Sequence, residues 1–259
     1  MAVLKVNQLS KSFGGLVAVK DFDLTLDDKE LVGLIGPNGA GKTTVFNLLT
    51  GVYVPTSGEI VLEGKSLLNM KPYEITALGM ARTFQNIRLF TELSVLDNVR
   101  VVQHWHRRYS IFNALFRLPG YFKGEDGMTR DAEDILEIME LSHRRNETAK
   151  NLPYGEQRRL EIARALAAKP KVLLLDEPAA GMNPQETHNL MKLISWLREE
   201  FCLTILLIEH DMSLVMGICE RILVLDHGIT IAHGTPDEIR RDPKVIGAYL
   251  GEEAADAVG

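Results

Sequence analysis

One nine-residue stretch constrains this chain more than any other. It reads Gly36-Pro37-Asn38-Gly39-Ala40-Gly41-Lys42-Thr43-Thr44 and directly follows the apolar run at residues 31–35. It completes the pattern GxxxxGK[ST], in which glycines let the backbone curl until several N–H groups point at one phosphate. In that pattern Lys42 meets the β- and γ-phosphates, and Thr43 ligates Mg²⁺. The sequence therefore predicts a strand, a phosphate-binding loop and a helix, and with them a nucleoside triphosphate site.

The composition fits one large α/β domain, or a core with a smaller lobe. The 259 residues are 46% hydrophobic, which is ordinary for a globular protein. The 29 basic and 35 acidic residues leave a net charge of −6, so broad electrostatic binding to nucleic acid is not expected. No apolar stretch approaches the roughly 18 residues of a membrane span, and residues 1–5 lack the features of a signal peptide. We therefore expect a protein that acts from outside the bilayer.

The two cysteines, Cys202 and Cys219, both stand in apolar stretches of the sequence. This placement favours small buried side chains in a reducing compartment over a disulfide or a metal site. The cytosol is then the expected compartment.

Hydrophobic periodicity divides the chain into a core and an inserted helical lobe. Strands are expected at 2–7, 16–26, 58–63, 172–175 and 203–208, and helices at 73–80, 94–103, 108–117, 128–140, 156–168, 184–200 and 211–218. We interpret residues 1–259 as one domain: a core with a β subdomain (1–72 and 170–250), a helical subdomain (73–169) and a frayed tail (251–259).

A second landmark is the apolar strand at residues 172–175, which ends in Asp176 and Glu177. In a phosphate-loop protein the first acid holds Mg²⁺ through water, and the second polarises the attacking water. A further apolar run, residues 203–208, shortly precedes His210. Parallel strands end at the sheet edge where ligands bind, so His210 is predicted to emerge beside the two acids.

These features form an ordered set across nearly the whole chain. The set comprises the triphosphate loop, Gln85, the segment Leu152-Pro153-Tyr154-Gly155-Glu156-Gln157, Asp176-Glu177 and His210. In order and spacing it resembles the ATP-binding cassette (ABC) ATPases. The resemblance implies an α/β phosphate-loop fold with a RecA-like parallel sheet core, an antiparallel β subdomain and an inserted helical subdomain. It also implies ATP and Mg²⁺ as cofactors and ATP hydrolysis as the activity.

The resemblance also implies roles for single residues. Phe13 would stack on adenine, with a core aromatic as the alternative. Gln85 would touch Mg²⁺ and the lytic water, with a solvated glutamine as the alternative. Magnesium would be held by Thr43, Gln85 and Asp176. His210 would contact the γ-phosphate as the switch histidine, with Glu177 as the catalytic base.

The family mechanism requires a head-to-tail dimer, in which residues 152–157 are the signature segment that caps ATP held by the partner's phosphate loop. The partner would be a second cassette, either a copy or a paralogue. Two departures from the family pattern stand out: Pro153 where the family has Ser, and Asn183 where it usually has Asp. Pro153 lacks both a hydroxyl and a backbone donor, which predicts a weaker closed dimer.

Five longer runs resemble the ATPase subunits of high-affinity branched-chain amino acid importers. These are residues 81–90, 154–166, 177–184, 208–216 and 242–251. The resemblance implies two membrane permease subunits, a solute-binding protein, no nucleic acid, and a place on the cytoplasmic face of the inner membrane. Urea-type importers and the lipopolysaccharide-export ATPase stay open as alternatives. So do a soluble ABC ATPase acting on nucleic acid or ribosomes, and a regulatory module that closes without turnover.

Two segments are candidate contacts for a membrane partner. Residues 104–123 contain four basic residues and no acid, with apolar residues on one helical face. This segment would lie against the permease or anionic headgroups, or would simply pack on the helical lobe with a solvated basic face. Phe84, Leu89 and Phe90 would form a groove for a permease helix, or would pack in the core.

Overall fold

The computed structural model describes the backbone of residues 2–103 and 119–256, and the side chains of residues 2–103 and 125–249. The chain divides into two compact units. We call the unit formed by Met1–Arg82 and Lys171–Gly259 the core unit, and the unit formed by Thr83–Pro170 the helical unit.

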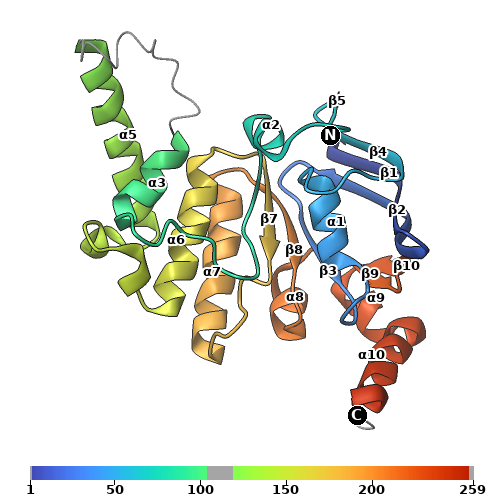
Figure 1. Ribbon diagram of the computed structural model, residues 1–259. Coiled ribbons are helices and arrows are strands. Elements are labelled where there is room, and N and C mark those ends of the chain that lie inside the picture. The colour runs from blue at the N-terminus through green and yellow to red at the C-terminus, as the bar shows by residue number, and fades with distance from the viewer. Residues whose placement is uncertain (1, 104–118, 257–259) are drawn as a thin grey trace. The chain divides into compact units, whose positions relative to one another are not determined.

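The core unit contains two sheets and the helices that cover them (Figure 1). Its strands are β1 (Ala2–Phe13), β2 (Leu16–Asp27), β3 (Leu31–Ile35), β4 (Ser57–Leu62), β5 (Lys65–Ser66), β6 (Met80–Arg82), β7 (Val172–Asp176), β8 (Thr204–Ile208), β9 (Arg221–Asp226) and β10 (Ile229–Gly234). Its helices are α1 (Lys42–Leu49), α2 (Pro72–Ala77), α7 (Pro184–Glu200), α8 (Met212–Ile218), α9 (Pro236–Arg241) and α10 (Pro243–Asp256).

The larger sheet has six strands in the order β10-β9-β3-β8-β7-β6. All neighbours run parallel except β10, which pairs antiparallel with β9. The strands β3, β7 and β8 are buried at every position, as expected for parallel strands covered on both faces. Their carboxyl ends lie at one edge of the sheet, which is where ligands bind in such folds.

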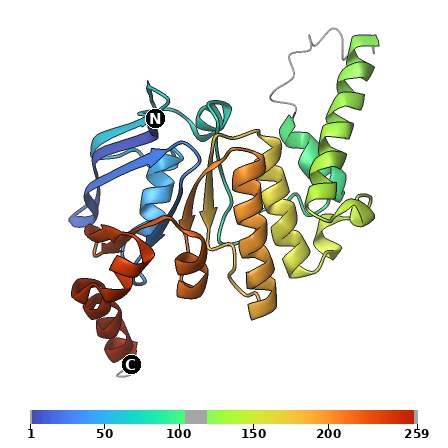
Figure 2. The ribbon, with the colours of Figure 1, turned by 180° about the vertical axis from the view of Figure 1, so that it is seen from behind.

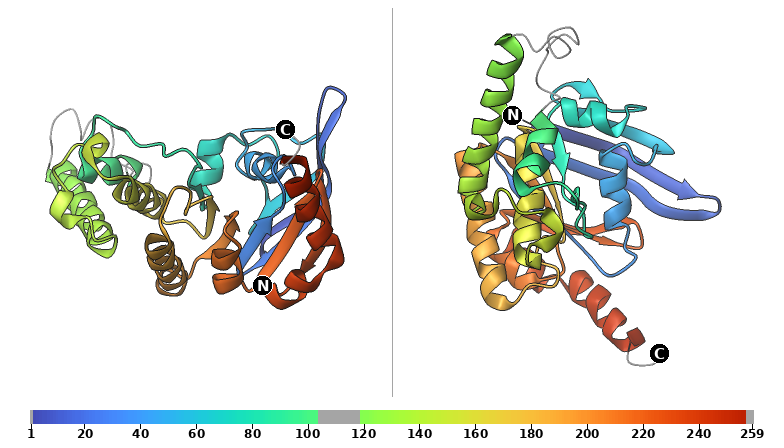
Figure 3. Two further views of the ribbon diagram at one scale, coloured as in Figure 1. Left: turned by 90° about the horizontal axis from the view of Figure 1, so that it is seen from below. Right: turned by 60° about the vertical axis from the view of Figure 1, so that its left-hand side comes forward.

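The smaller sheet is antiparallel, with the order β2-β1-β4-β5, and its long strands β1 and β2 are clear in Figure 3. Its apolar side chains share one core with α1 and one face of the parallel sheet. Phe22 of β2, Phe46 of α1 and Leu174 of β7 are all fully buried in this core. The helix that follows the phosphate loop is therefore held between two sheets.

The opposite face of the parallel sheet is covered by α7 and α8 (Figure 2). Gly33 of β3 brings this face close to α8, because an added Cβ would lie 3.1 Å from both Val215 Cγ1 and Cys219 Sγ. Burial raises the pKa of the Cys219 thiol to about 12, so this cysteine is chemically inert. Cys202, which we expected to be buried, is exposed in the turn after α7.

The described residues of the helical unit include the helices α3 (Val95–Gln103), α5 (Pro119–Ile138) and α6 (Tyr154–Ala167). Two short 3₁₀ turns, Ser142–Arg144 and Ala149–Asn151, lie between α5 and α6. The side chains of Val99, Leu136 and Leu160 are fully buried, one from each helix. An ion pair of 2.8 Å between Arg100 and Glu125 links α3 to α5.

The expected mixture of a parallel core sheet, an antiparallel sheet and a helical insertion is confirmed, but three boundaries differ. Residues 73–82 belong to the core unit, because β6 pairs with β7. Helix α5 begins at Pro119, before the expected start at residue 128. Residues 251–256, expected as part of a frayed tail, continue helix α10.

The expected helix at 108–117, and most of the basic segment 104–123, lie outside the described residues. Among the helices that the structure describes, none combines the length and apolar character needed to cross a membrane.

The start of α7 depends on Asn183, one of the two departures noted in the sequence. Its Oδ1 accepts the N–H groups of Gln185 and Glu186 at 3.0 Å each, and the Glu186 carboxylate accepts the Asn183 N–H at 2.9 Å. This is a complete capping box, so asparagine here serves the helix as an aspartate would.

We predict that Asn183→Ala lowers the free energy of unfolding by about 1 kcal/mol, because two N–H groups lose their acceptor. Asn183→Asp keeps the cap and adds a negative charge at the helix N-terminus, so stability should stay the same or rise by a few tenths of a kcal/mol. Urea denaturation of the two variants beside the parent chain measures both effects. Equal stability of the alanine variant and the parent would contradict this role of Asn183.

Candidate active site

The phosphate loop joins β3 to α1 and can form only with glycine at two positions. Gly36 and Gly41 have φ of 146° and 105°. A Cβ at Gly36 would lie 2.0 Å from the Leu225 carbonyl oxygen, and one at Gly41 would lie 2.6 Å from that of Ala18. Such approaches are impossible for any residue with a side chain. The tight loop expected from the sequence is therefore present.

Lys42 lies inside this loop, with only 6% of its surface exposed. Its Nζ donates to the carbonyl oxygens of Gly36 at 2.5 Å and Pro37 at 2.8 Å. Asn38 and Gly39 at the tip of the loop, and Thr43 in the first turn of α1, are exposed. An ammonium group and the N–H groups of a helix start are the donors that a triphosphate needs, so the loop fits this ligand.

Asp176 and Glu177 follow at the end of β7. Asp176 is 2% exposed, and its Oδ2 lies 2.7 Å from a guanidinium nitrogen of Arg82. Glu177 has a φ of 47°, which is unusual for a residue with a side chain, and its N–H donates to the Ile208 carbonyl at 2.9 Å. Backbone strain of this kind gathers at functional sites, where the surrounding structure holds it in place.

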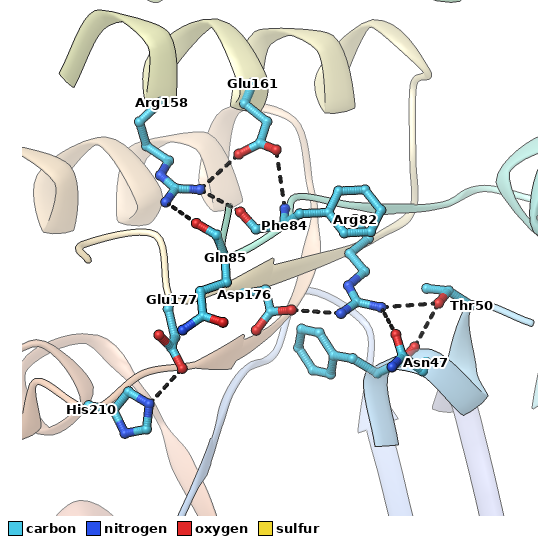
Figure 4. A network of polar contacts seen from close by, with 11 residues as sticks. Asn47, Thr50, Arg82, Phe84, Gln85, Arg158, Glu161, Asp176, Glu177 and His210 are labelled. Atoms are coloured by element: carbon cyan, nitrogen blue, oxygen red, sulfur yellow. Dashed lines mark hydrogen bonds and ion pairs between the residues drawn. The ribbon is translucent and has the colours of Figure 1, made fainter. Parts of the chain in front are cut away.

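His210 reaches Glu177 from the neighbouring strand. The last residues of β7 and β8, Asp176 and Ile208, lie opposite each other in parallel register. The His210 Nε2 therefore comes within 2.5 Å of the Glu177 Oε1 (Figure 4). The sequence predicted that these two side chains would meet at one sheet edge, and the structure places them in direct contact.

Glu209 is a residue of this edge that the sequence analysis passed over. It is 3% exposed, and its carboxylate accepts the Ala179 N–H at 2.7 Å and the His210 N–H at 3.1 Å. Burial raises the pKa of this carboxyl. It ties the turn after β7 to the turn after β8, and so holds the backbone that carries Glu177 and His210. Its signal in the sequence is an acid directly after the apolar run at residues 203–208.

Gln85 belongs to the helical unit, where its backbone is anchored to α6. Arg158, fully buried, donates to the carbonyl oxygens of Phe84 at 2.6 Å and Gln85 at 2.8 Å. Glu161 pairs with Arg158 at 2.8 Å (Figure 4). It also accepts the Arg88 N–H at 3.1 Å. Burial raises the pKa of the Glu161 carboxyl. The sequence hint was an arginine and an acid three residues apart on an otherwise apolar helix face.

The segment 152–157 forms the start of α6 in the same unit. Pro153 is the N-cap residue, with φ −54° and no side-chain hydrogen bond to the helix. Tyr154 is 45% exposed, and the Gln157 side chain donates to the Leu152 carbonyl at 2.8 Å. Glu156 lies 3.3 Å from Arg144. At this end of the helix Pro153 and Tyr154 are therefore exposed to solvent, while the Gln157 side chain bonds to the residue before Pro153.

Phe13 ends β1 and is 42% exposed, so it is not a core aromatic. Its ring meets the Tyr53 ring edge-on at 5.1 Å between centroids, and the Lys11 ammonium lies 5.0 Å from the Phe13 centroid. A partly exposed ring is able to stack on a base. Tyr53 was not singled out from the sequence, because a lone tyrosine in a turn carries no pattern.

Two of the three oxygen ligands expected for Mg²⁺ lie on elements of the core unit, and the third, Gln85, belongs to the helical unit. The Thr43 hydroxyl stands at the start of α1 and the Asp176 carboxylate at the end of β7, and both are groups that Mg²⁺ accepts. Within the described ranges, no cluster of three or more His, Cys, Asp or Glu residues could hold a metal ion. Mg²⁺ is usually bound by one or two protein groups together with substrate phosphates and water, so these two oxygens fit a metal that accompanies a nucleotide.

Comparison with known proteins agrees with this geometry. Residues 19–180 match the model of the ABC transporter family, and residues 230–255 match the model described as branched-chain amino acid ATP-binding cassette transporter. The high-affinity branched-chain amino acid transport ATP-binding protein LivG of Salmonella typhimurium is 50% identical over 250 residues. That alignment covers 96% of this chain and 98% of the relative.

Solved structures give the same result. The ADP conformation of MJ1267, an ATP-binding cassette of an ABC transporter, superposes with a TM-score of 0.84 at 31% identity, covering 97% of this chain and 99% of that one. The cassette MJ0796, solved as a dimer bound to ADP and phosphate, has a TM-score of 0.76 at 26% identity and covers 90% of this chain and 98% of that one. Because a family model spans more than half of the chain and a relative shares half of its residues, this chain belongs to the ABC transporter family of ATP-binding cassettes.

Proposed function

We propose that this chain binds ATP with Mg²⁺ and hydrolyses ATP to power the import of branched-chain amino acids. The observation that carries the enzymatic part is the 2.5 Å contact between Glu177 and His210, at the same sheet edge as the phosphate loop. The cargo is supported by the 50% identity to a LivG protein across nearly the full length of both chains.

The chain's own residues account for each step of hydrolysis. The phosphate loop and Lys42 bind the triphosphate, and Phe13 stacks on the base. Magnesium would be held by Thr43 and Asp176, with Gln85 as the third ligand that the family resemblance implies, and would neutralise negative charge on the phosphates. Glu177 accepts the proton of the water that attacks the γ-phosphorus, and His210 orients Glu177 and contacts the γ-phosphate.

The helical unit supports a role in a head-to-tail dimer. The start of α6 has N–H groups without helical partners and a positive dipole end, which suit a γ-phosphate held by a second cassette. Residues 152–157 would therefore serve the partner's ATP. The buried pair of Arg158 and Glu161 ties Gln85 to the same helix, so Gln85 and residues 152–157 should move together.

The partners follow from the same proposal. The second cassette is a copy or a paralogue, and two membrane permease subunits and a solute-binding protein complete the importer. The chain would then lie on the cytoplasmic face of the inner membrane. The Phe90 ring is 47% exposed, and the Arg164 guanidinium lies 4.8 Å from the centre of the ring. This exposed apolar ring, five residues after Gln85, supports a contact with a permease helix.

We predict that Glu177→Gln lowers steady-state ATP hydrolysis by about 100-fold or more, because the general base is lost while the phosphate loop is intact. Nucleotide affinity should stay within about threefold, since the amide keeps the shape of the side chain. Hydrolysis and nucleotide binding are measured in parallel, with Glu220→Gln as a surface control in the same unit. Hydrolysis at the parental rate in Glu177→Gln would exclude Glu177 as the base.

We predict that Pro153→Ser strengthens the ATP-dependent dimer about tenfold, the value of one added hydrogen bond to a charged group. The comparison is made in a Glu177→Gln background by analytical ultracentrifugation. Pro153→Ala restores the backbone N–H without the hydroxyl, so it separates the two contributions. Dimer affinities that are equal across proline, alanine and serine would contradict a role for this position in the interface.

We predict that the chain co-purifies with two permease chains from its native membrane, and that leucine with its capture protein raises ATP turnover of that complex several-fold. Urea with its own capture protein, and lipopolysaccharide, are tested separately as alternative cargoes. Stimulation by either of these in place of leucine would keep the ATPase and overturn the proposed cargo. Co-purification with ribosomes would favour a soluble ABC ATPase.

A further inference from the structure

One arginine, Arg82, connects the strand that ends in Asp176 to the helix that follows the phosphate loop. It is the last residue of β6, and it lies opposite Leu174 in the pairing with β7. One guanidinium nitrogen lies 2.7 Å from Asp176 Oδ2, and the two side chains are only 6% and 3% exposed. Because both side chains are buried, no water competes for their charged groups, and the ion pair keeps a fixed geometry.

The second terminal nitrogen of the Arg82 guanidinium, Nη1, reaches helix α1. It donates to Asn47 Oδ1 at 2.7 Å and lies 3.4 Å from Thr50 Oγ1 (Figure 4). The Thr50 hydroxyl donates its own proton to the Phe46 carbonyl at 2.7 Å, so it meets Arg82 as an acceptor. The guanidinium also lies 5.3 Å from the centre of the Phe46 ring. One planar group therefore joins β7 to α1.

This bridge spans the two elements that present oxygen ligands for a metal. Asn47 lies four residues after Thr43, so Thr43 stands one helical turn before the anchored residue on the same rigid helix. At the other end of the bridge, Arg82 holds the carboxylate of Asp176 itself. The separation between the Thr43 hydroxyl and the Asp176 carboxylate is thus set in part by a third residue.

We propose that Arg82 is a positioning residue for the metal of the nucleotide: it orients the Asp176 carboxylate and fixes its spacing from Thr43. This inference rests on the proposed function, since it concerns the Mg²⁺ that would accompany ATP. Residues that orient metal ligands through hydrogen bonds commonly change metal affinity by 10- to 100-fold when replaced.

Arg82 has a simpler alternative role, which is to neutralise a buried acid. Lysine would serve that role equally well, because it carries the same charge. Lysine would not replace the bridge between β7 and α1, because one ammonium group cannot reproduce a planar guanidinium that contacts Asp176 on one side and Asn47 on the other. Arg82→Lys therefore separates positioning from charge, and Arg82→Met removes both.

The experiment measures the affinity of the purified chain for a non-hydrolysable ATP analogue, once with excess Mg²⁺ and once with EDTA. The ratio of the two dissociation constants is the preference of the protein for the metal-bound nucleotide. We expect Arg82→Lys and Arg82→Met to lower this preference by about tenfold, while binding in EDTA stays within about twofold of the parent.

Four further variants act as controls. Asp176→Asn should abolish the preference for Mg²⁺. Asn47→Ala removes only the helix end of the bridge and should cause a smaller loss, and adding it to Arg82→Lys should cause no further loss because both act through one contact. Arg221→Lys alters another arginine bridge of the core unit, between Glu30 and the Thr25 carbonyl, and should leave the preference unchanged. Thermal unfolding of each variant shows that it is folded.

Each other outcome overturns the inference. If Arg82→Lys behaves as the parent, Arg82 acts through charge alone. If both Arg82 variants weaken binding equally with Mg²⁺ and with EDTA, the residue has a structural role only. If the parent itself shows no preference for Mg²⁺, the proposed metal site fails and the inference fails with it. A preference that is lost in Asp176→Asn and kept in Arg82→Lys leaves the proposed function intact and removes only the inference.

Discussion

The candidate active site depends first on the parallel pairing of β3, β8 and β7. This pairing brings the phosphate loop after β3, Glu177 after β7 and His210 after β8 to one edge of a single sheet. The strands are short, mostly apolar and buried at every position, so burial on both faces stabilises the pairing, and the polar residues lie at the strand ends. A one-residue slip of β7 against β8 would separate Glu177 from His210, since their contact at 2.5 Å requires Asp176 to face Ile208.

Buried charge pairs then hold the candidate site residues of each unit in place. Arg82 with Asp176 in the core unit, and Arg158 with Glu161 in the helical unit, are almost fully removed from water. Such pairs are costly to bury, so they add little net stability unless further hydrogen bonds complete them. Both arginines make those further bonds, Arg82 to α1 and Arg158 to the carbonyls of Phe84 and Gln85. Their effect is to orient the backbone and side chains around Asp176 and Gln85.

Much of the fold was predictable because each element has a local cause. The apolar runs that became β3, β7 and β8, and the capped helix α7, are visible in sequence as patterns of a few residues. The structure places residues 73–82 in the core unit, where the sequence pattern favoured the helical subdomain, because β6 is only three residues long and is defined by its pairing with β7. Cys202 was expected to be buried because its neighbours are apolar, but a left-handed turn after α7 leaves it exposed.

The sequence by itself determined the phosphate loop, because its glycines and its lysine stand at fixed spacing within nine consecutive residues. It also determined that two acids and a histidine would follow apolar strands. Only the tertiary structure decided which charges pair. Arg82 meets Asp176 across 94 residues of sequence, and Arg158 meets the Gln85 carbonyl across 73. The partner of a buried charge is chosen by strand order and helix packing, which relate residues that no local pattern connects.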